Sequence, residues 1–134
     1  MNLNWLVGRH CTDVNKPSEW ATAFAFADAV LYVEALWRIT VDGQLRRTSG
    51  DDGQAYGLGA PIDACCAARE LLCGRAITAV RVDLARGDLV LAFGPSHQLE
   101  IITDSHYEPW QLTAPGKMSL QAQVVGLTIS APEV

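Results

Sequence analysis

The side chains best suited to chemistry gather in one short segment near the C-terminal end, Ser105-His106-Tyr107-Glu108-Pro109-Trp110. Aromatic rings beside a carboxylate can hold a small ligand or anchor a protein interface. Because Glu108 precedes a proline, its backbone should be extended and its side chain should point outward. We predict binding residues at Tyr107, Glu108 and Trp110, with Arg38 as a further member of the site. A structural alternative stays open, in which Trp110 belongs to the core and Glu108 caps a backbone group or pairs with Arg38.

A second candidate site is the pair Asp51 and Asp52, which lies in a glycine-rich loop. Together with Asp104 or Glu108, these carboxylates could surround a cation with oxygen ligands. The loop has neither the spacing of a calcium-binding loop nor its closing glutamate. We therefore predict Asp51 and Asp52 as binding residues, with no metal ion and no cofactor. A solvated turn is the alternative.

The four cysteines are spaced in a way that argues against a zinc site. Cys65 and Cys66 are adjacent on a predicted helix, so their side chains point about 100° apart. Cys66 and Cys73 share a side of that helix but lie about 10 Å apart along its axis, whereas a Zn–S bond measures about 2.3 Å. Only the recruitment of Cys11 or His10 would complete a ligand set. We predict reduced thiols that pack as small buried hydrophobic groups.

No motif for catalysis accompanies the three histidines, His10, His97 and His106. A nucleophile and its base meet in space, so a Cys–His pair stays open. The neighbours His10 and Cys11 are no evidence for one, because adjacent residues in a strand point to opposite faces. The sequence lacks the serine-hydrolase, zinc-protease, phosphate-loop and dinucleotide motifs. We predict no catalytic residues and favour a protein that is not an enzyme.

The composition predicts one soluble domain over residues 1–134. Hydrophobic residues make up 49% and charged residues 19% of the chain, an ordinary balance for a globular protein. The net charge of −5 argues against nucleic acid, whose phosphates need a basic face, and against an anionic membrane surface. The longest apolar stretch, residues 21–39, is interrupted by charges, and no signal peptide precedes it. We therefore expect a cytoplasmic location.

Alternating side chains predict strands in the first half of the chain. Residues 20–27 place Trp20, Thr22, Phe24 and Phe26 on one face of a strand. Residues 31–41 are predicted as one longer strand. Asp42-Gly43 then makes a hairpin turn, because glycine accepts the positive φ that a tight turn requires. The other expected features of this half are a first segment at 5–15, a turn at 15–18 and a returning strand at 44–48.

Residues 61–73 form the one clear helix of the prediction. Proline suits the first helical position, Asp63 lies near the positive end of the helix dipole, and Gly74 is a natural C-terminal cap. The apolar side chains of this segment share one face, at Ala64, Cys65, Ala68, Leu71 and Leu72. We expect that face to pack on the sheet.

The second half is rich in strands again, and the whole pattern predicts an α+β fold. Strands are expected at residues 78–84, 89–93, 98–103, 110–113 and 120–129. The architecture is a mostly antiparallel β-sandwich or half-barrel with one central amphipathic helix. In addition, Gly8-Arg9-x-x-Thr12-x-Val14 matches Gly74-Arg75-x-x-Thr78-x-Val80. We infer an internal repeat of residues 5–48 and 74–113, with chance similarity between short strands as the alternative.

Several short motifs of the chain are distinctive when they are taken together. They are Trp37-Arg38-Ile39, Asp51-Asp52-Gly53-Gln54-Ala55-Tyr56-Gly57-Leu58, Pro61-Ile62-Asp63-Ala64, Gly87-Asp88-Leu89-x-Leu91-x-Phe93, Leu99-Glu100-Ile101 and Ser105-His106-Tyr107-Glu108-Pro109-Trp110-Gln111-Leu112. This set resembles a group of small uncharacterised bacterial proteins of unknown function, over roughly residues 5 to 115. The chain departs from that group at His106, where the group has glycine, and in lacking a glycine-rich C-terminal segment. The resemblance implies a shared fold and no chemistry.

Three functions stay open at this point. The first is a non-enzymatic protein-binding domain, in its narrowest form an immunity-type inhibitor, whose acidity would steer it onto a basic partner. The likeness to immunity proteins of bacterial toxin systems is an analogy of fold. The second is a ligand-binding domain or enzyme with a pocket near Trp37, Arg38 and Glu108, in which Arg38 binds an anion and Glu108 acts as base. The third is a structural domain without a ligand that forms homo-oligomers, such as a homodimer, through an exposed strand edge.

Overall fold

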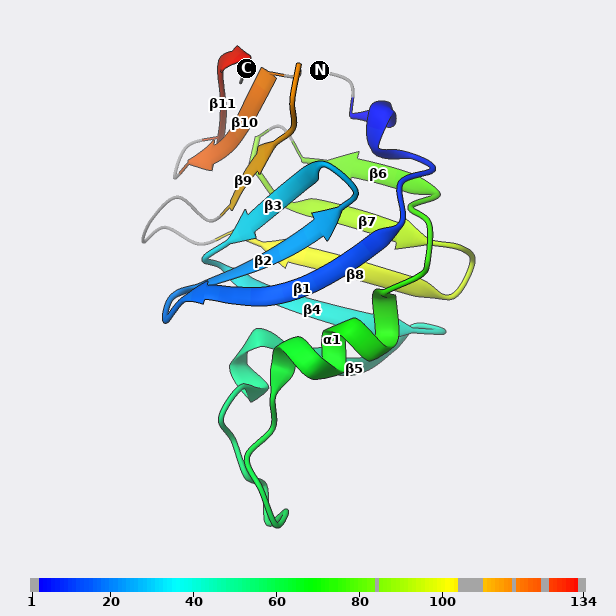
Figure 1. Ribbon diagram of the computed structural model, residues 1–134, viewed down its shortest axis with the longest axis vertical. Helices are drawn as coiled ribbons and strands as arrows, with labels where there is room; N and C mark the ends of the chain where they lie inside the picture. The colour runs from blue at the N-terminus through cyan, green and yellow to red at the C-terminus, as the bar shows by residue number, and fades with distance from the viewer. Residues whose placement is uncertain (1–2, 84, 104–109, 117, 124–125, 133–134) are drawn as a thin grey trace.

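Two antiparallel β-sheets face each other in a sandwich that is not closed into a barrel (Figure 1). The computed structural model describes residues 3–83, 85–103, 110–116, 118–123 and 126–132. The six-stranded sheet has the order β1 (Cys11–Ser18), β2 (Ala21–Phe26), β3 (Ala29–Val33), β9 (Trp110–Thr113), β10 (Met118–Gln123), β11 (Gly126–Pro132). The five-stranded sheet has the order β5 (Gln44–Thr48), β4 (Leu36–Val41), β8 (His97–Ile102), β7 (Leu89–Phe93), β6 (Ala79–Val82). The predicted α+β sandwich is confirmed.

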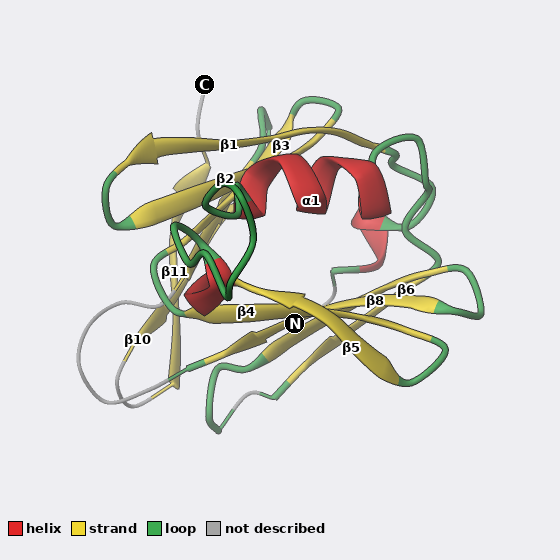
Figure 2. Cartoon of the chain, turned by 90° about the horizontal axis from the view of Figure 1, so that it is seen from below, coloured by secondary structure: helices red, strands yellow, loops and turns green. Residues whose placement is uncertain are grey.

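One α-helix, α1 (Ala64–Leu72), lies between the two sheets along one side of the sandwich (Figure 2). It contacts β1 and β5, which are the edge strands of the two sheets. The helix begins three residues later than predicted, because Asp63 acts as its N-cap and accepts a 3.0 Å hydrogen bond from the Cys66 N–H. The helix buries most of its predicted apolar face, namely Ala64, Cys65, Ala68 and Leu72. In the described part of the chain, no helix is long and apolar enough to cross a membrane.

Two single-turn 3₁₀ helices complete the described elements, η1 (Asn4–Leu6) and η2 (Ser49–Asp51). The predicted turn at Asp42-Gly43 connects β4 to β5 and is confirmed. Both of its residues have positive φ, 53° and 77°, which is the backbone that a two-residue hairpin requires.

Aromatic side chains from both sheets fill the space between the layers. Phe26 of β2 contacts Phe93 of β7 with a ring separation of 6.1 Å. Phe24 meets Trp37 of β4 edge to face at 5.5 Å, so this pair also joins the two sheets. Burial of each such side chain stabilises the fold by roughly 1.5–3 kcal/mol. The sandwich is therefore held mainly by contacts between residues far apart in the sequence.

The prediction of one long strand over residues 31–41 is wrong. The segment forms β3 and β4, which belong to different sheets, and the chain crosses the sandwich at Glu34 and Ala35. Alternation of buried and exposed side chains continues without interruption from Leu31 to Ile39. Because the period-two pattern survives the crossing and no glycine or proline marks it, the sequence offers no sign of the break.

The prediction of a turn at residues 15–18 is also wrong. Strand β1 continues to Ser18, and the turn to β2 falls at Glu19 and Trp20. Pro17 is tolerated within β1 because this strand lies at the edge of its sheet, where a missing N–H need not break the ladder. The pairing of β1 with β2 shifts register between Asn15 and Ser18, next to this proline.

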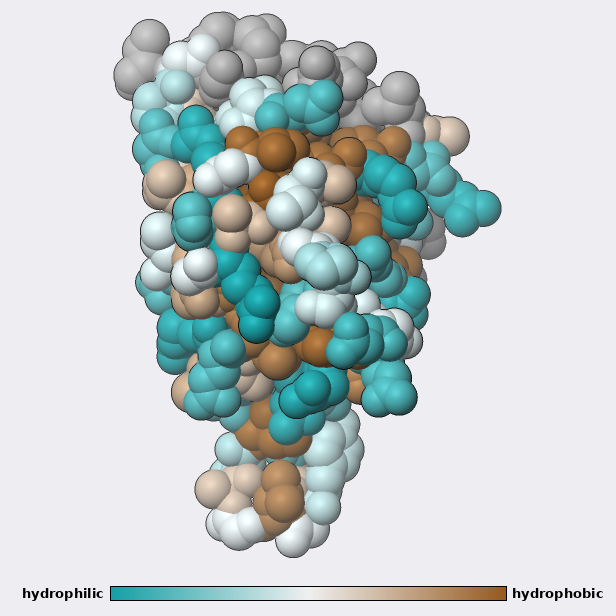
Figure 3. Space-filling view, turned by 90° about the vertical axis from the view of Figure 1, so that its right-hand side faces the viewer, coloured by the Kyte–Doolittle hydropathy of each residue, from teal (hydrophilic) through white to brown (hydrophobic). Residues whose placement is uncertain are grey.

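A long arm, residues 53–62, projects from the body of the sandwich beyond η2 and α1 (Figure 3). Its base is closed by two backbone hydrogen bonds, from Gly53 N–H to Ile62 O at 2.8 Å and from Ile62 N–H to Gln54 O at 2.9 Å. Tyr56 and Leu58 are exposed near its end. The arm is therefore pinned at its base and displays two large apolar side chains.

Candidate functional site

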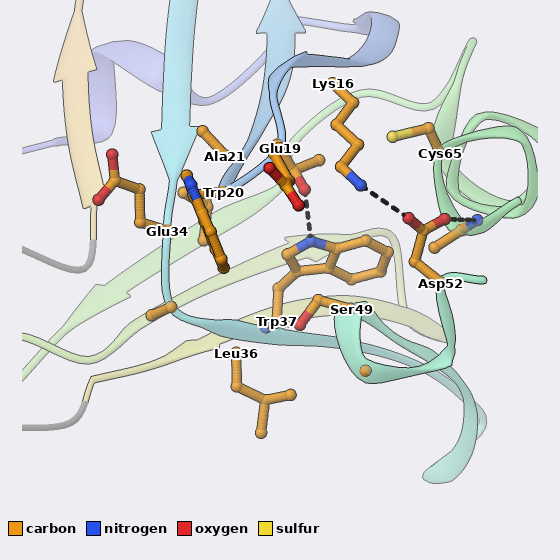
Figure 4. A pocket seen from close by; sticks show the side chains of 15 residues that line it. Lys16, Glu19, Trp20, Ala21, Glu34, Leu36, Trp37, Ser49, Asp52 and Cys65 are labelled. Atoms are coloured by element: carbon orange, nitrogen blue, oxygen red, sulfur yellow. Dashed lines mark hydrogen bonds and ion pairs between the residues drawn. The ribbon is translucent and has the colours of Figure 1, made fainter. Parts of the chain in front are cut away.

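A groove of about 460 Å³ opens at one end of the sandwich, between the β1–β2 turn, the β3–β4 crossing, η2 and the first turn of α1 (Figure 4). Four segments that are distant in the sequence meet there. The side chains that define it for the argument below are Lys16, Glu19, Trp20, Glu34, Leu36, Trp37, Ser49, Asp52 and Cys65. We call this feature the groove.

Trp37 forms the floor of the groove and is held on three sides. Its indole Nε1–H donates to Thr22 Oγ1 at 3.1 Å, and its backbone N–H donates to Ser49 Oγ at 3.1 Å. Its ring packs against Phe24, and the residue is only 1% exposed. Because its polar groups are paired and its ring is packed, the floor is rigid and apolar.

Trp20 forms one wall of the groove and is 76% exposed. It lies in the β1–β2 turn, where its backbone N–H donates to Ser18 Oγ at 3.3 Å. The prediction that Trp20 lies on one face of a strand together with Phe24 is therefore wrong. A large indole displayed to solvent beside a hollow is the kind of surface that partners use as an anchor. Leu36, at the β3–β4 crossing, adds a second exposed apolar side chain to the rim.

Asp52 connects the groove to the helix. One carboxylate oxygen accepts from the Ala64 N–H at 3.0 Å, and the other accepts from Lys16 Nζ at 3.0 Å. The Ala64 N–H and the Lys16 ammonium hold the pKa of Asp52 below its usual range. The same contact raises the pKa of Lys16, because Asp52 stabilises its charged form. Asp52 is therefore an ionised acceptor at neutral pH rather than a proton donor.

A second hollow of about 500 Å³ adjoins the groove at the Lys16–Asp52 ion pair. The two hollows share Lys16, Asp52 and Cys65, and the second extends to Arg69 of α1. Lys16 has an exposed side chain, so the pair is open to solvent. A ligand with its own cation could compete for Asp52 at this point.

The groove carries an excess of negative charge. One cationic side chain, Lys16, and three carboxylates, those of Glu19, Glu34 and Asp52, line it. Asp52 forms an ion pair with Lys16, whereas Glu19 and Glu34 form no ion pair among the described residues. Both glutamates are exposed. The arrangement favours a cationic group placed near Trp20.

Asp51 makes different contacts from its neighbour Asp52. Its carboxylate accepts from the Thr48 N–H at 3.0 Å and from the Tyr56 hydroxyl at 2.9 Å, and it lies 3.7 Å from Arg47 Nη1. The Thr48 N–H is the main reason that the pKa of Asp51 lies below its usual value. The contact with Tyr56 ties the arm to η2. Of the predicted pair, only Asp52 is among the groove residues.

The other predicted binding residues lie elsewhere. Arg38 pairs with Glu100 across β4 and β8, with 2.7 Å between Nε and Oε2, and it is not among the groove residues. Trp110 is buried, and its Nε1–H donates to the Gly87 carbonyl at 2.6 Å. Tyr107 and Glu108 lie outside the described residues. The pocket expected around Arg38 and Glu108 therefore stays a prediction, and its expected member Trp37 lies in the groove instead.

The groove offers no nucleophile and base in contact among its described residues. The Ser49 hydroxyl accepts from the backbone of Trp37, and burial raises the pKa of the Cys65 thiol. Among the residues that the structure describes, no histidine lines the groove. In the described part of the chain, no cluster of three or more histidine, cysteine or acidic side chains could hold a metal ion. The groove therefore combines an apolar floor with a negative rim.

Sequence reasoning missed Lys16, Glu19, Trp20 and Glu34 as members of one site. A weak signal was present, because Trp20 follows the polar run Pro17-Ser18-Glu19, which is typical of a turn. A tryptophan in such a turn is exposed unless another element covers it. Glu34 carried no signal at all, since it sits within an uninterrupted alternating pattern.

Comparison with known proteins gives one match. No curated protein and no solved structure matches the chain. A family model described as a family of unknown function, DUF6188, matches residues 22–126. The matched segment contains Trp37 and Asp52 and begins after Lys16, Glu19 and Trp20, so it includes the groove floor and leaves out one wall. Because the match covers well over half of the chain, the protein belongs to this family of unknown function, DUF6188.

Proposed function

We propose that this protein is a non-enzymatic binding domain, whose groove takes a segment of a partner protein that carries a basic side chain next to an apolar one. The observation that carries the proposal is Trp20, a 76% exposed indole on the wall of a hollow with a buried tryptophan as its floor. Exposed tryptophans in such surroundings are among the residues that contribute most to protein binding.

The charge of the groove supports a basic partner. Glu19 and Glu34 are exposed on the rim without an ion pair among the described residues, and the whole chain has a net charge of −5. An arginine or lysine side chain could stack on the Trp20 ring while these carboxylates neutralise it. Long-range attraction would also speed the encounter with a basic protein and weaken at high salt.

The groove's polar groups support a binding role over a catalytic one. Asp52 is held as an anion by Ala64 N–H and Lys16, and Ser49 accepts from a backbone N–H. Neither group is arranged to transfer a proton to a bound molecule. In its narrowest form the proposal is an inhibitor of the immunity type, which would block a basic enzyme in the bacterial cytoplasm.

Dye-labelled hexapeptides test the chemistry of the groove directly. Each peptide pairs a leucine with an arginine, a glutamine or a glutamate, and fluorescence anisotropy measures its binding to the full chain. We expect the arginine peptides to bind most tightly and the glutamate peptides most weakly, with a difference that shrinks as salt rises. Trp20→Ala should weaken the arginine peptides at least about tenfold, since stacking of a cation on an indole is lost.

Leu45→Ala is the matched control for this test, because Leu45 is 59% exposed on β5 and does not line the groove. Equal binding of all three peptide types, or equal binding by the Trp20 and Leu45 variants, would contradict the proposal.

Native mass spectrometry of the chain purified gently from its host then tests whether a partner protein co-purifies with it. A basic protein that is bound by the wild type and by Leu45→Ala, and is lost with Trp20→Ala, supports the proposal, whereas a symmetric dimer favours homo-oligomerisation.

A further inference from the structure

At the end of α1 opposite the groove, two cysteines that are 62 positions apart lie against each other. Cys11 Sγ and Cys73 Sγ are 3.7 Å apart. Cys11 begins β1, and Cys73 is the C-cap of α1. Both are free thiols in this structure. From their positions in the sequence, neither could be recognised as the partner of the other.

The backbone at this point is already clamped in place. The Cys11 N–H donates to the Arg75 carbonyl at 3.0 Å, and the Gly74 N–H donates to the Cys11 carbonyl at 2.9 Å. Next to these two bonds, the backbones of Cys11 and Cys73 form a parallel bridge. Adjacent backbones with sulfur atoms already in contact satisfy the main requirement for a disulfide, so only a small rotation of the side chains has to follow.

The geometry points to a reversible modification site, at which Cys11 and Cys73 form an intramolecular disulfide by exchange with a small disulfide of the glutathione class. The site is independent of the groove and of the function proposed for it. Cys73 is half-exposed and Cys11 is buried, so the two thiols have unequal access to a soluble oxidant. The unequal access sets the order of the reaction.

Cys73 reacts first, as a thiolate that attacks one sulfur of the soluble disulfide and releases the first thiol. Cys11 then attacks the Cys73 sulfur of this mixed disulfide and releases the second thiol. The two released thiols carry the protons that Cys11 and Cys73 lose. The two cysteines are oxidised by two electrons in total, and the soluble disulfide is reduced by the same two electrons. The products are one protein disulfide and two molecules of the soluble thiol.

Burial, together with the neighbouring charge and hydrogen bond of Cys73, raises the pKa of Cys11. A buried thiol with a raised pKa is a poor nucleophile toward an outside molecule. In the mixed disulfide the Cys11 sulfur already lies beside the Cys73 sulfur, so the second step needs no encounter with an outside molecule. The arrangement favours closure of the pair over reaction of Cys11 with an outside molecule.

Peptide mapping after treatment of the folded chain with oxidised glutathione tests the proposal. Trypsin separates Cys11, in residues 10–38, from Cys73, in residues 70–75, and from the Cys65–Cys66 pair, in residues 48–69. We expect the first two peptides to appear joined, with the intact chain lighter by two hydrogen atoms. Reduction with dithiothreitol should separate them again. Because the bond closes a long loop, the melting temperature should rise by roughly 5–15 °C on oxidation.

Two variants make the outcome decisive. Cys66→Ser alters the exposed cysteine of α1, and it should keep both the joined peptides and the rise in melting temperature. Cys73→Ser should lose both, and because this residue is half-exposed it tests the idea without the strain of changing buried Cys11. The inference is overturned if the peptides remain separate while glutathione accumulates on Cys73, or if the oxidised chain joins a peptide containing Cys65 or Cys66 instead.

Discussion

The two ends of α1 face the same strand, β1, and yet they make very different contacts. At its first turn the helix meets β1 through an open ion pair, in which Asp52 bridges the Ala64 N–H and Lys16. At its last turn it meets β1 through the packed sulfur atoms of Cys11 and Cys73, and backbone hydrogen bonds join Cys11 to Gly74 and Arg75. Midway, the Arg69 guanidinium donates to the Val14 carbonyl.

This contrast teaches how one element can support both stability and binding. The last turn of α1, which we call the closed end, buries Leu72 and Cys11 almost completely, so it holds the helix on the sandwich. The first turn of α1, which we call the open end, lies beside Trp20 and Lys16, whose side chains are exposed to solvent. Changes there alter the surface that a partner would meet. Binding residues drawn from the weakly packed end can vary without unfolding the domain.

The largest expected difference is in the free energy of unfolding, between a variant of Leu72 at the closed end and a variant of Trp20 at the open end. Leu72→Ala should lower the free energy of unfolding by about 2–5 kcal/mol, because it leaves a cavity in the core. Trp20→Ala removes a larger side chain but should change stability by no more than about 0.5 kcal/mol, since the indole is exposed. Urea unfolding of both variants measures this. A similar loss in the two variants would show that the open end is packed after all.

A smaller loss of stability should follow from changing Asp52, whose carboxylate accepts from the Ala64 N–H at the open end of the helix. The pKa of Asp52 is lowered in the folded state, so its contribution to stability is present above the usual aspartate pKa and is lost as the pH falls through the folded value. Asp52→Asn should cost about 1 kcal/mol at pH 7, because a charge-assisted hydrogen bond becomes a neutral one. The variant should also lose less stability than the wild type on acidification.

Unfolding by urea between neutral and acid pH checks this prediction. Asp63→Asn is the control, since asparagine caps a helix as well as aspartate does and the change also removes one negative charge. If the two variants show the same pH dependence, the contact of Asp52 with Ala64 and Lys16 does not contribute in the way described.

The smallest effect on stability should come from Lys16, whose side chain is exposed. Lys16→Ala should leave the melting temperature nearly unchanged, because exposed ion pairs contribute little. It should nevertheless tighten the binding of arginine peptides by roughly two- to fivefold, since Asp52 becomes available to the ligand. Arg81→Ala removes the same charge from β6, outside the groove, and should show no such gain. An equal gain in both variants would mean that net charge alone decides.

Much of the local structure could be predicted from the sequence. The alternation in β7 and β8, the hairpin turn at Asp42-Gly43 and the buried face of α1 all follow from short-range patterns. Each depends on the geometry of a few consecutive residues, such as the period of a strand or a helix. These predictions therefore needed no knowledge of what the segment packs against.

The long-range features were decided by the tertiary structure alone. Arg38 finds Glu100 because β4 pairs with β8, and Cys11 finds Cys73 because β1 runs beside α1. The crossing at Glu34 moves the chain from one sheet to the other without altering the alternating pattern. Sequence alone determined the helix and the approximate places of most strands, since backbone geometry is local. Sheet order and the position of the helix decided which side chains meet, because packing of the whole core selects one arrangement among many with the same local pattern.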